Sequence, residues 1–260
     1  MKNMEEVAQS ICEICGGTGW EVVLEGNISR AKRCSCSREP ASDRLLKLAK
    51  IPPRFLGCEF ENYEPQSFHQ ERAKSLLMSY VADYPNLDDE IFREAGLLFT
   101  GRSGRGKTHL AVAVLKGLLK KGVSCLFVDF HELLAEIRNS YDELSQTSEL
   151  QILRPILNVD LLLLDDLASQ RMTEWMQDTV FHIINLRYGQ KKPLIVTTNL
   201  SMEPLKGSPQ SSLQDRLGYR VISRLYEMCT GIDVDSETDY RKDVRKAGSD
   251  LLRNKKEVNQ

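Results

Sequence analysis

The chain has 260 residues, with 35 lysines and arginines against 37 aspartates and glutamates and a formal net charge of −2. This length accommodates one full-sized domain with a small addition, and the near-neutral charge does not single out a nucleic-acid-binding protein. No apolar stretch approaches the ~20 residues that span a bilayer, and the first residues lack the apolar segment of a secretory signal. We therefore expect a cytoplasmic protein without a membrane partner, whose seven cysteines are reduced rather than paired in disulfides.

Residues 1–40 are predicted to form a small metal-binding module. Four cysteines occur in two close pairs, Cys12 with Cys15 and Cys34 with Cys36, in a region with few apolar residues. Four thiolates in this arrangement suit a tetrahedral Zn²⁺. The second pair is one residue closer than the common C-x-x-C spacing, so metal-free reduced cysteines and an iron–sulfur cluster remain open alternatives.

Residues 41–90 are predicted to be a helical and extended linker. Leucine spacing predicts a short helix over 42–50 that the following proline pair ends, and a second helix is predicted over 70–84. Between them, residues 55–63 read as extended chain. The stretch 30–54 holds eight basic and two acidic residues, which indicates either contact with DNA phosphates or a solvated helix face.

From residue 91 to 236 apolar runs alternate with helical periodicity, which predicts a three-layer α/β domain with a parallel sheet. A charged tail, residues 237–260, follows. Strands are predicted at 96–100, 124–129, 159–164, 194–198 and, more weakly, 231–234, and helices at 108–121, 130–141, 173–189 and 211–228, the last with a break at Gly218.

A glycine-rich G-x-x-x-x-G-K-T motif stands between the first of these strands and the first helix. Such a loop aims backbone N–H groups and a helix N-terminus at phosphate oxygens, so it predicts a nucleotide site rather than an ordinary turn. Lys107 is expected to reach the β- and γ-phosphates, and the Thr108 hydroxyl to ligate Mg²⁺. The residues expected to cradle the nucleotide are Gly101, Arg102, Ser103, Gly104, Arg105, Gly106, Lys107, Thr108 and His109.

Polar residues follow two of the apolar strands. Asp165 and Asp166 come directly after four leucines, which is the form of a Walker B element. We expect Asp165 to hold the Mg²⁺ and Asp166 to polarise the attacking water as general base. Asn199 ends a second strand and is expected to orient that water, a role called sensor 1.

Arginines at helical spacing occur near residue 220. Arg220 and Arg224 lie four residues apart, which is typical of a solvated helix face. The functional alternative is an arginine finger that reaches the γ-phosphate held by a neighbouring subunit.

Several further segments complete the pattern: Cys15-Gly16-Gly17-Thr18-Gly19-Trp20, Ile51-Pro52-Pro53-Arg54-Phe55, Leu163-Leu164-Asp165-Asp166-Leu167, Thr173-Glu174-Trp175, Arg187-Tyr188, Thr197-Thr198-Asn199-Leu200-Ser201, Ser223-Arg224-Leu225 and Asp239-Tyr240-Arg241. Together with the P-loop they resemble the DnaC-type helicase loaders, a DnaC/IstB-like family of bacterial AAA+ ATPases. The likeness covers nearly the whole chain. The P-loop is common to many ATPases, whereas the order of the Asp-Asp-Leu, Thr-Glu-Trp and Thr-Thr-Asn-Leu segments is much more specific.

The resemblance implies an ATPase that binds a hexameric replicative helicase through its N-terminal region and places it on single-stranded DNA. It implies self-association into a spiral or ring, with ATP and Mg²⁺ as ligands, and gives residues 41–90 a role in contacting helicase or DNA. Ser223-Arg224-Leu225 is similar to the family's box VII, so Arg224 would be the arginine finger, with Arg220 in reserve. The family's strand order would bring the Asn199 strand between the P-loop strand and the Asp165 strand.

Two features depart from the family pattern. Asp166 stands where many such ATPases carry glutamate, and its shorter arm suits a slow switch better than a fast motor. The residues after Val234 are too few for the helical lid of many AAA+ proteins, so no sensor 2 arginine is identified and Arg241 is only a candidate.

Two other functions compete with the loader. One is a transposition helper ATPase that coats DNA for a transposase, and the other is a nucleotide-gated adaptor with negligible turnover. The cysteine module and the segment 173–175 favour the loader over the transposition helper. Phosphate release that depends on Lys107 would separate the loader from the adaptor.

Overall fold

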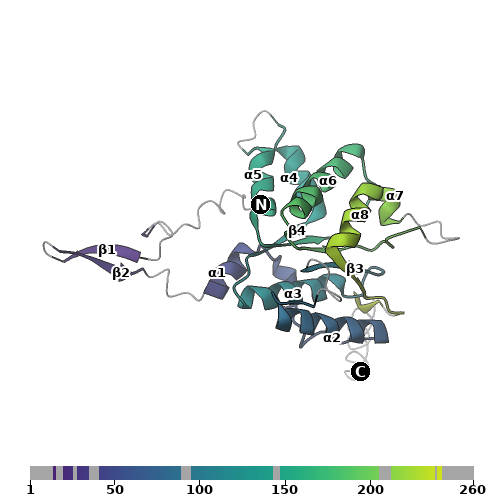
Figure 1. Cartoon of the computed structure of the whole chain (residues 1–260), viewed down its shortest axis with the longest axis horizontal. Coiled ribbons are helices and arrows are strands. Elements are labelled where there is room, and N and C mark those ends of the chain that lie inside the picture. The colour runs from purple at the N-terminus through teal and green to yellow at the C-terminus, as the bar shows by residue number, and fades with distance from the viewer. Residues whose placement is uncertain are drawn as a thin grey trace, which may run out of the picture.

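A five-stranded parallel sheet with helices on both faces forms the body of the protein (Figure 1). The computed structural model describes residues 14–15, 20–25, 28–34, 41–88, 95–142, 147–204, 212–237 and 239–241. The expected three-layer α/β fold is confirmed. The elements are β1 (Trp20–Glu25), β2 (Ile28–Arg33), α1 (Ala41–Leu48), the 3-10 turn η3 (Pro53–Phe55), α2 (Phe68–Asp83), β3 (Gly96–Thr100), α3 (Lys107–Lys120), β4 (Cys125–Asp129), α4 (Phe130–Asn139), α5 (Glu149–Asn158), β5 (Leu161–Asp165), α6 (Glu174–Gly189), β6 (Leu194–Thr197), α7 (Leu213–Leu217), α8 (Tyr219–Met228) and β7 (Cys229–Asp233).

The strand order in the sheet is β4-β5-β6-β3-β7, and every neighbouring pair is parallel. All five predicted strands are present within two residues at each end. As the resemblance implied, β6 lies between the P-loop strand β3 and the Asp165 strand β5. The carboxyl ends of these three strands therefore meet at one edge of the sheet.

The sheet divides the core into two apolar layers because alternate side chains of a strand point to opposite faces. Leu162 and Leu164 of β5 pack in the layer with α4, α5, α6, α7 and α8. Leu161 and Leu163 pack in the layer with α1, α2 and α3. Figure 1 shows these two groups of helices on opposite faces of the sheet. Burial on both faces explains why the strand reads as an unbroken leucine run.

The linker residues differ from the extended chain expected over 55–63. They form the η3 turn and further turns, and Tyr63 joins the buried layer beneath α3. The backbone N–H of Phe127 on the edge strand β4 donates to the Ala49 carbonyl at 2.8 Å. Helix α2 packs closely on α3, since a Cβ added to Gly117 would lie 2.6 Å from Val81 Cγ1. Packing thus continues across the predicted domain boundary at residue 91.

Besides the η3 turn, helix α5 and the hairpin β1–β2 were not predicted from the sequence. Helix α5 carries Pro155 inside it, which reads as a helix breaker, although Ser148 and Gln151 form a capping box at its start. The hairpin β1–β2 pairs Trp20 with Arg33 at its open end. Predicted helix 211–228 is two helices, because Gly218 at φ 79° breaks it as anticipated.

The hairpin stands apart from the sheet domain in Figure 1 and lies within the region predicted to bind zinc. Cys15 and Cys34 flank it and are both buried. Cys12 and Cys36 lie outside the described residues. Within the described ranges, no group of three or more His, Cys, Asp or Glu side chains is arranged to hold a metal.

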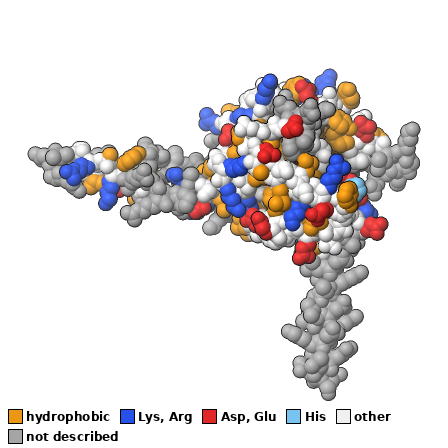
Figure 2. All heavy atoms as spheres, turned by 60° about the horizontal axis from the view of Figure 1, so that its bottom comes forward, with side chains coloured by type: hydrophobic (Ala, Val, Ile, Leu, Met, Phe, Trp, Pro, Cys, Tyr) orange, Lys and Arg blue, Asp and Glu red, His pale blue; other side chains and the backbone are white. Residues whose placement is uncertain are grey.

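Charges of both signs are interspersed over the face of the domain shown in Figure 2. That view therefore shows no large area of a single sign on this face. No helix within the described ranges is long and apolar enough to cross a membrane.

Candidate functional site

A hollow of about 740 Å³ opens at the carboxyl edge of the sheet. It is lined by the P-loop that joins β3 to α3, by the ends of β5 and β6, by the linker and by the C-terminal segment. The residues that the next paragraphs use are Tyr63, Gln70, Arg105, Lys107, Thr108, His109, Asp165, Asp166, Thr197 and Arg241.

The P-loop turns sharply into helix α3. Gly106 precedes the helix in the left-handed region, at φ 86°, where a side chain is strained. A Cβ there would also lie 2.6 Å from Cε2 of Tyr63. The loop therefore needs glycine at this position for its backbone conformation and for the close approach of the linker.

Lys107 is buried at the bottom of the loop, with 8% of its surface exposed. Its Nζ donates hydrogen bonds to the carbonyls of Gly101, at 2.8 Å, and Arg102, at 2.9 Å. Burial lowers the pKa of Lys107 to about 8, although the nearby carboxylates of Asp166 and Asp165 partly offset this. A desolvated ammonium in this setting is stabilised by an added anion.

Thr108, Asp165 and Thr197 form a hydrogen-bonded group beside the lysine. Thr108 Oγ1 donates to Asp165 Oδ1 at 2.9 Å, and Thr197 Oγ1 donates to the same oxygen at 2.5 Å. Burial raises the pKa of Asp165, the two hydroxyl donors lower it, and nearby Asp166 and Asp129 raise it further. Carboxylates crowded in this way favour a bound cation.

Asp166 follows Asp165 with a left-handed backbone, at φ 56°. Its N–H donates to Thr197 Oγ1 at 2.9 Å. Its carboxylate Oδ2 lies 3.5 Å from Nε2 of His131. Thr197 thus joins the two aspartates. No role was predicted for Thr197 from the sequence, because threonine is common at strand ends.

The linker contributes a wall of the hollow. Tyr63 and Gln70 both donate to the carbonyl of Arg105, at 3.3 and 3.0 Å. His109 bonds through Nε2 to the Glu59 carbonyl at 2.9 Å and lies edge-on to Tyr63. No motif pointed to Tyr63 or Gln70, since only the fold brings them to the P-loop.

The C-terminal segment also returns to the P-loop. Arg102 binds Asp235 Oδ1 at 3.1 Å and the Ser236 carbonyl at 2.8 Å. The N–H of Tyr240 donates to the Gly104 carbonyl at 3.3 Å. Arg241 then lines the hollow and is close enough to lower the pKa of Lys107 slightly.

Four residues predicted for the nucleotide site are not among those that line the hollow: Gly101 and Arg102 of the P-loop, and Asn199 and Arg224. Asn199 is two residues beyond β6, and its Oδ1 is buried without a hydrogen-bond partner among the described residues. Arg224 on α8 places its guanidinium 5.0 Å from the Phe181 ring centre and 5.5 Å from that of Tyr188. Neither residue is among those that line the hollow.

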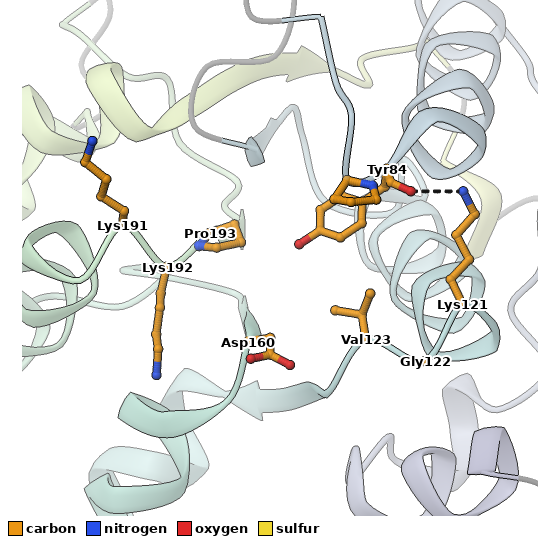
Figure 3. Close-up of a pocket in the computed structure, with 9 residues that line it drawn as sticks. Tyr84, Lys121, Gly122, Val123, Asp160, Lys191, Lys192 and Pro193 are labelled. Atoms are coloured by element: carbon orange, nitrogen blue, oxygen red, sulfur yellow. Dashed lines mark hydrogen bonds between the residues drawn. The ribbon is translucent and has the colours of Figure 1, made fainter.

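A second hollow, of about 730 Å³, lies at the opposite, amino edge of the sheet (Figure 3). Lys121 Nζ donates to the Tyr84 carbonyl at 3.2 Å, and Lys192 Nζ donates to the Asn158 carbonyl at 2.8 Å. Asp160 accepts from the Ser124 hydroxyl at 2.6 Å. These hydrogen bonds join separate segments of the fold, which indicates a structural role for the residues around this hollow.

The residues at the carboxyl edge fit a nucleotide with Mg²⁺. Mg²⁺ is commonly bound by one or two carboxylates together with substrate phosphates and waters, and Asp165 with Thr108 supplies hard oxygen ligands. The buried ammonium of Lys107 and the glycine loop supply donors for an anion. The hollow is also large enough for a nucleotide.

Comparison with known families agrees with this geometry. Residues 22–247 match the family model described as IstB-like ATP binding protein. The chain belongs to this family. This IstB-like protein is also 30% identical over 236 residues to the replicative helicase loader DnaC of Escherichia coli (strain K12), a match that covers 86% of the present chain and 90% of that relative.

Solved structures show the same fold. The crystal structure of the DnaC helicase loader matches with a TM-score of 0.59 and 34% identity, over 70% of this chain and 99% of that one. The crystal structure of DnaI matches with a TM-score of 0.56 and 25% identity, over 74% and 94% of the two chains. The IstB-like family and its AAA+ fold are thereby established for this protein.

Proposed function

We propose that this IstB-like protein is a cytoplasmic ATPase that loads a hexameric replicative helicase onto single-stranded DNA. The observation that carries the proposal is the group of Lys107, Thr108 and Asp165 at the carboxyl edge, in a chain 30% identical to a helicase loader. Assembly into a spiral or ring of subunits is part of the proposal.

The proposed roles of Lys107, Thr108, Asp165 and Asp166 follow from their contacts, and that of Asn199 from its place after β6. Lys107 would exchange its two carbonyl partners for phosphate oxygens, and Thr108 and Asp165 would hold Mg²⁺. Bound Mg²⁺ supplies positive charge to the phosphate oxygens. Asp166, partly exposed at the hollow, would accept a proton from the attacking water, and Asn199 would orient that water.

We propose that Arg224 acts on the nucleotide of a neighbouring subunit. Its absence from the lining of its own chain's hollow supports a role in trans rather than in cis. In the single chain its NH1 donates to the Arg220 carbonyl at 3.0 Å, and its Nε is buried without a partner among the described residues. Mixing an Arg224→Ala variant with the wild-type protein should depress turnover, because each variant subunit removes a finger from its neighbour.

We propose that Cys12, Cys15, Cys34 and Cys36 bind one Zn²⁺. An isolated two-stranded hairpin is marginally stable in water, and the buried Cys15 and Cys34 stand at the two ends of β1–β2. A metal that links these ends would hold the hairpin closed. Elemental analysis should give about one zinc per chain, and Cys15→Ser should lose it.

The decisive test of the proposed function has two parts. Labelled ATP should bind saturably to the wild-type protein and not to Lys107→Ala, and phosphate release should depend on Lys107 in the same way. Equal release by the two proteins would identify a nucleotide-gated adaptor instead. Affinity purification should then recover a replicative helicase, and recovery of a transposase in its place would favour a transposition helper.

A further inference from the structure

The carboxylate of Asp166 contacts a histidine that lies outside the ATPase motifs. His131 lies in the first turn of α4, where Asp129 Oδ1 accepts a hydrogen bond from the His131 N–H at 2.8 Å. The His131 ring places Nε2 at 2.6 Å from Ser169 Oγ and at 3.5 Å from Asp166 Oδ2. A single ring nitrogen therefore faces both side chains.

The backbone around Asp166 is anchored without His131. The N–H of Asp166 donates to Thr197 Oγ1 at 2.9 Å, and Arg216 NH1 donates to the Ser169 carbonyl at 2.8 Å. What remains to be oriented is the Asp166 carboxylate. Among the residues that the structure describes, its only ion-pair or hydrogen-bond contact is with His131.

We propose that His131 is a positioning residue that orients Asp166 toward the attacking water. The inference rests on the proposed function, in which Asp166 is the general base. Asp166 lines the nucleotide hollow and His131 does not, so His131 acts through the carboxylate and not on the substrate. The short arm of an aspartate makes an external support more important than it is for a glutamate.

Ser169 competes for the same nitrogen. In a neutral imidazole, Nε2 is either a donor or an acceptor, so one proton on it serves one acceptor at a time. The 2.6 Å contact with Ser169 and the 3.5 Å contact with Asp166 are alternatives for that proton. Removal of the Ser169 hydroxyl should therefore strengthen the support of Asp166, whereas removal of the ring should abolish it.

Three variants test this assignment: His131→Ala, His131→Gln and Ser169→Ala. At saturating ATP, His131→Ala should lower kcat about tenfold, because a misplaced base is inefficient, while ATP affinity stays within about twofold. His131→Gln retains an amide donor and should recover part of the rate. Ser169→Ala should turn over at the wild-type rate or faster.

A second measurement does not depend on turnover. In ¹⁵N NMR spectra of the histidine rings, His131→Gln identifies the His131 signals by their loss. Asp166→Asn and Ser169→Ala should each shift the Nε2 resonance of His131, whereas Lys191→Ala at the far edge of the sheet should not. If the Nε2 resonance of His131 does not shift in Asp166→Asn, the proposal is overturned.

The outcomes distinguish the role of His131 from the proposed ATPase function on which it rests. Turnover that requires Lys107 but is unchanged in His131→Ala overturns the role of His131 alone. A loss of ATP affinity in His131→Ala that matches its loss of rate also overturns it, since a positioning residue acts on kcat. Equal phosphate release by wild type and Lys107→Ala overturns both proposals together.

Discussion

The hollows at the two edges of the sheet are nearly equal in volume, about 740 and 730 Å³, but their lysines differ in burial. Lys107 is buried, whereas Lys121 is exposed and Lys192 is half-buried. At the amino edge, Lys121 and Lys192 donate to carbonyls at the ends of α2 and α5. At the carboxyl edge, burial disfavours the charged forms of Lys107 and Asp165. A bound ligand of opposite charge would therefore stabilise the charged form of each group.

The comparison shows that volume alone does not identify a binding site. A buried polar group that is already paired contributes to the fold, and one that is desolvated without full compensation gains free energy from a partner. Arg187 and Arg105 show the same contrast between two buried arginines. Arg187 donates to four backbone carbonyls and leaves only its Nε without a partner among the described residues. Nε and NH1 of Arg105 make no hydrogen bond to the described residues, and its Nε lies 3.7 Å from Asp235 Oδ1.

The largest expected effect is on folding. Arg187 is fully buried and joins the end of α5 to the starts of β5 and β6. Replacing it with methionine leaves those carbonyls unpaired, so Arg187→Met should lower the free energy of unfolding by about 3–5 kcal/mol in urea titrations. The exposed Arg154 on α5 is the matched control, and Arg154→Met should cost less than about 0.5 kcal/mol. Similar losses in the two variants would contradict the role of Arg187.

The next effect is on ligand binding. Lys107→Ala removes the buried ammonium of the P-loop, and ATP affinity should fall at least about a hundredfold, or about 2.7 kcal/mol, in titrations with labelled ATP. Lys191→Ala removes a lysine from the other hollow and should leave ATP affinity unchanged. If both variants bind ATP like the wild type, the carboxyl edge is not the nucleotide site.

The pH dependence of binding should reflect the lowered pKa of Lys107, about 8 without nucleotide. Phosphate oxygens favour the charged ammonium and raise this pKa in the complex, so affinity is full below pH 8 and declines as the pH rises through that value. Between pH 7 and pH 9 the dissociation constant should increase about tenfold. Lys107→Arg stays charged and controls for ionisation of ATP itself, so it should lack this rise.

The smallest effect distinguishes two adjacent lysines at the amino edge. Lys192 Nζ donates to the carbonyls of Leu157 and Asn158, at 2.9 and 2.8 Å. The ammonium of Lys191 makes no hydrogen bond to the residues that the structure describes. Lys192→Ala should lower the free energy of unfolding by about 1 kcal/mol, and Lys191→Ala by less than about 0.5 kcal/mol. A reversed order would show that this hollow is not held together by its paired lysines.

The predicted parts of the fold are those with a strong local signal. Leucine runs of strand length and the glycine spacing of the P-loop located β3, β5 and the start of α3 to within two residues. Helix α5 was missed because proline usually breaks a helix. In the structure, Pro155 nevertheless lies inside α5. The turns of residues 53–63 were missed because their packing under α3 involves partners far along the chain.

The candidate site likewise contains residues that motifs predicted and residues that they did not. Lys107, Thr108, Asp165 and Asp166 were named from motifs, since each motif is a short segment whose residue types imply its chemistry. Thr197 was named only as part of a motif and was given no role, although it bonds both aspartates from a different strand. Tyr63 and Gln70 reach the hollow from segments with no phosphate-binding pattern, and Arg241, only a candidate from the sequence, lines it from the C-terminal segment.

The sequence by itself determined the parallel α/β architecture and the phosphate-binding loop, because periodicity and glycine spacing act over a few neighbouring residues. Its motif segments carried the resemblance to the family. Only the tertiary structure decided that the linker and the C-terminal segment line the same hollow, and that His131 faces Asp166. It also decided which buried charges are paired. These facts depend on contacts between residues far apart in the chain, and local patterns carry no record of such contacts.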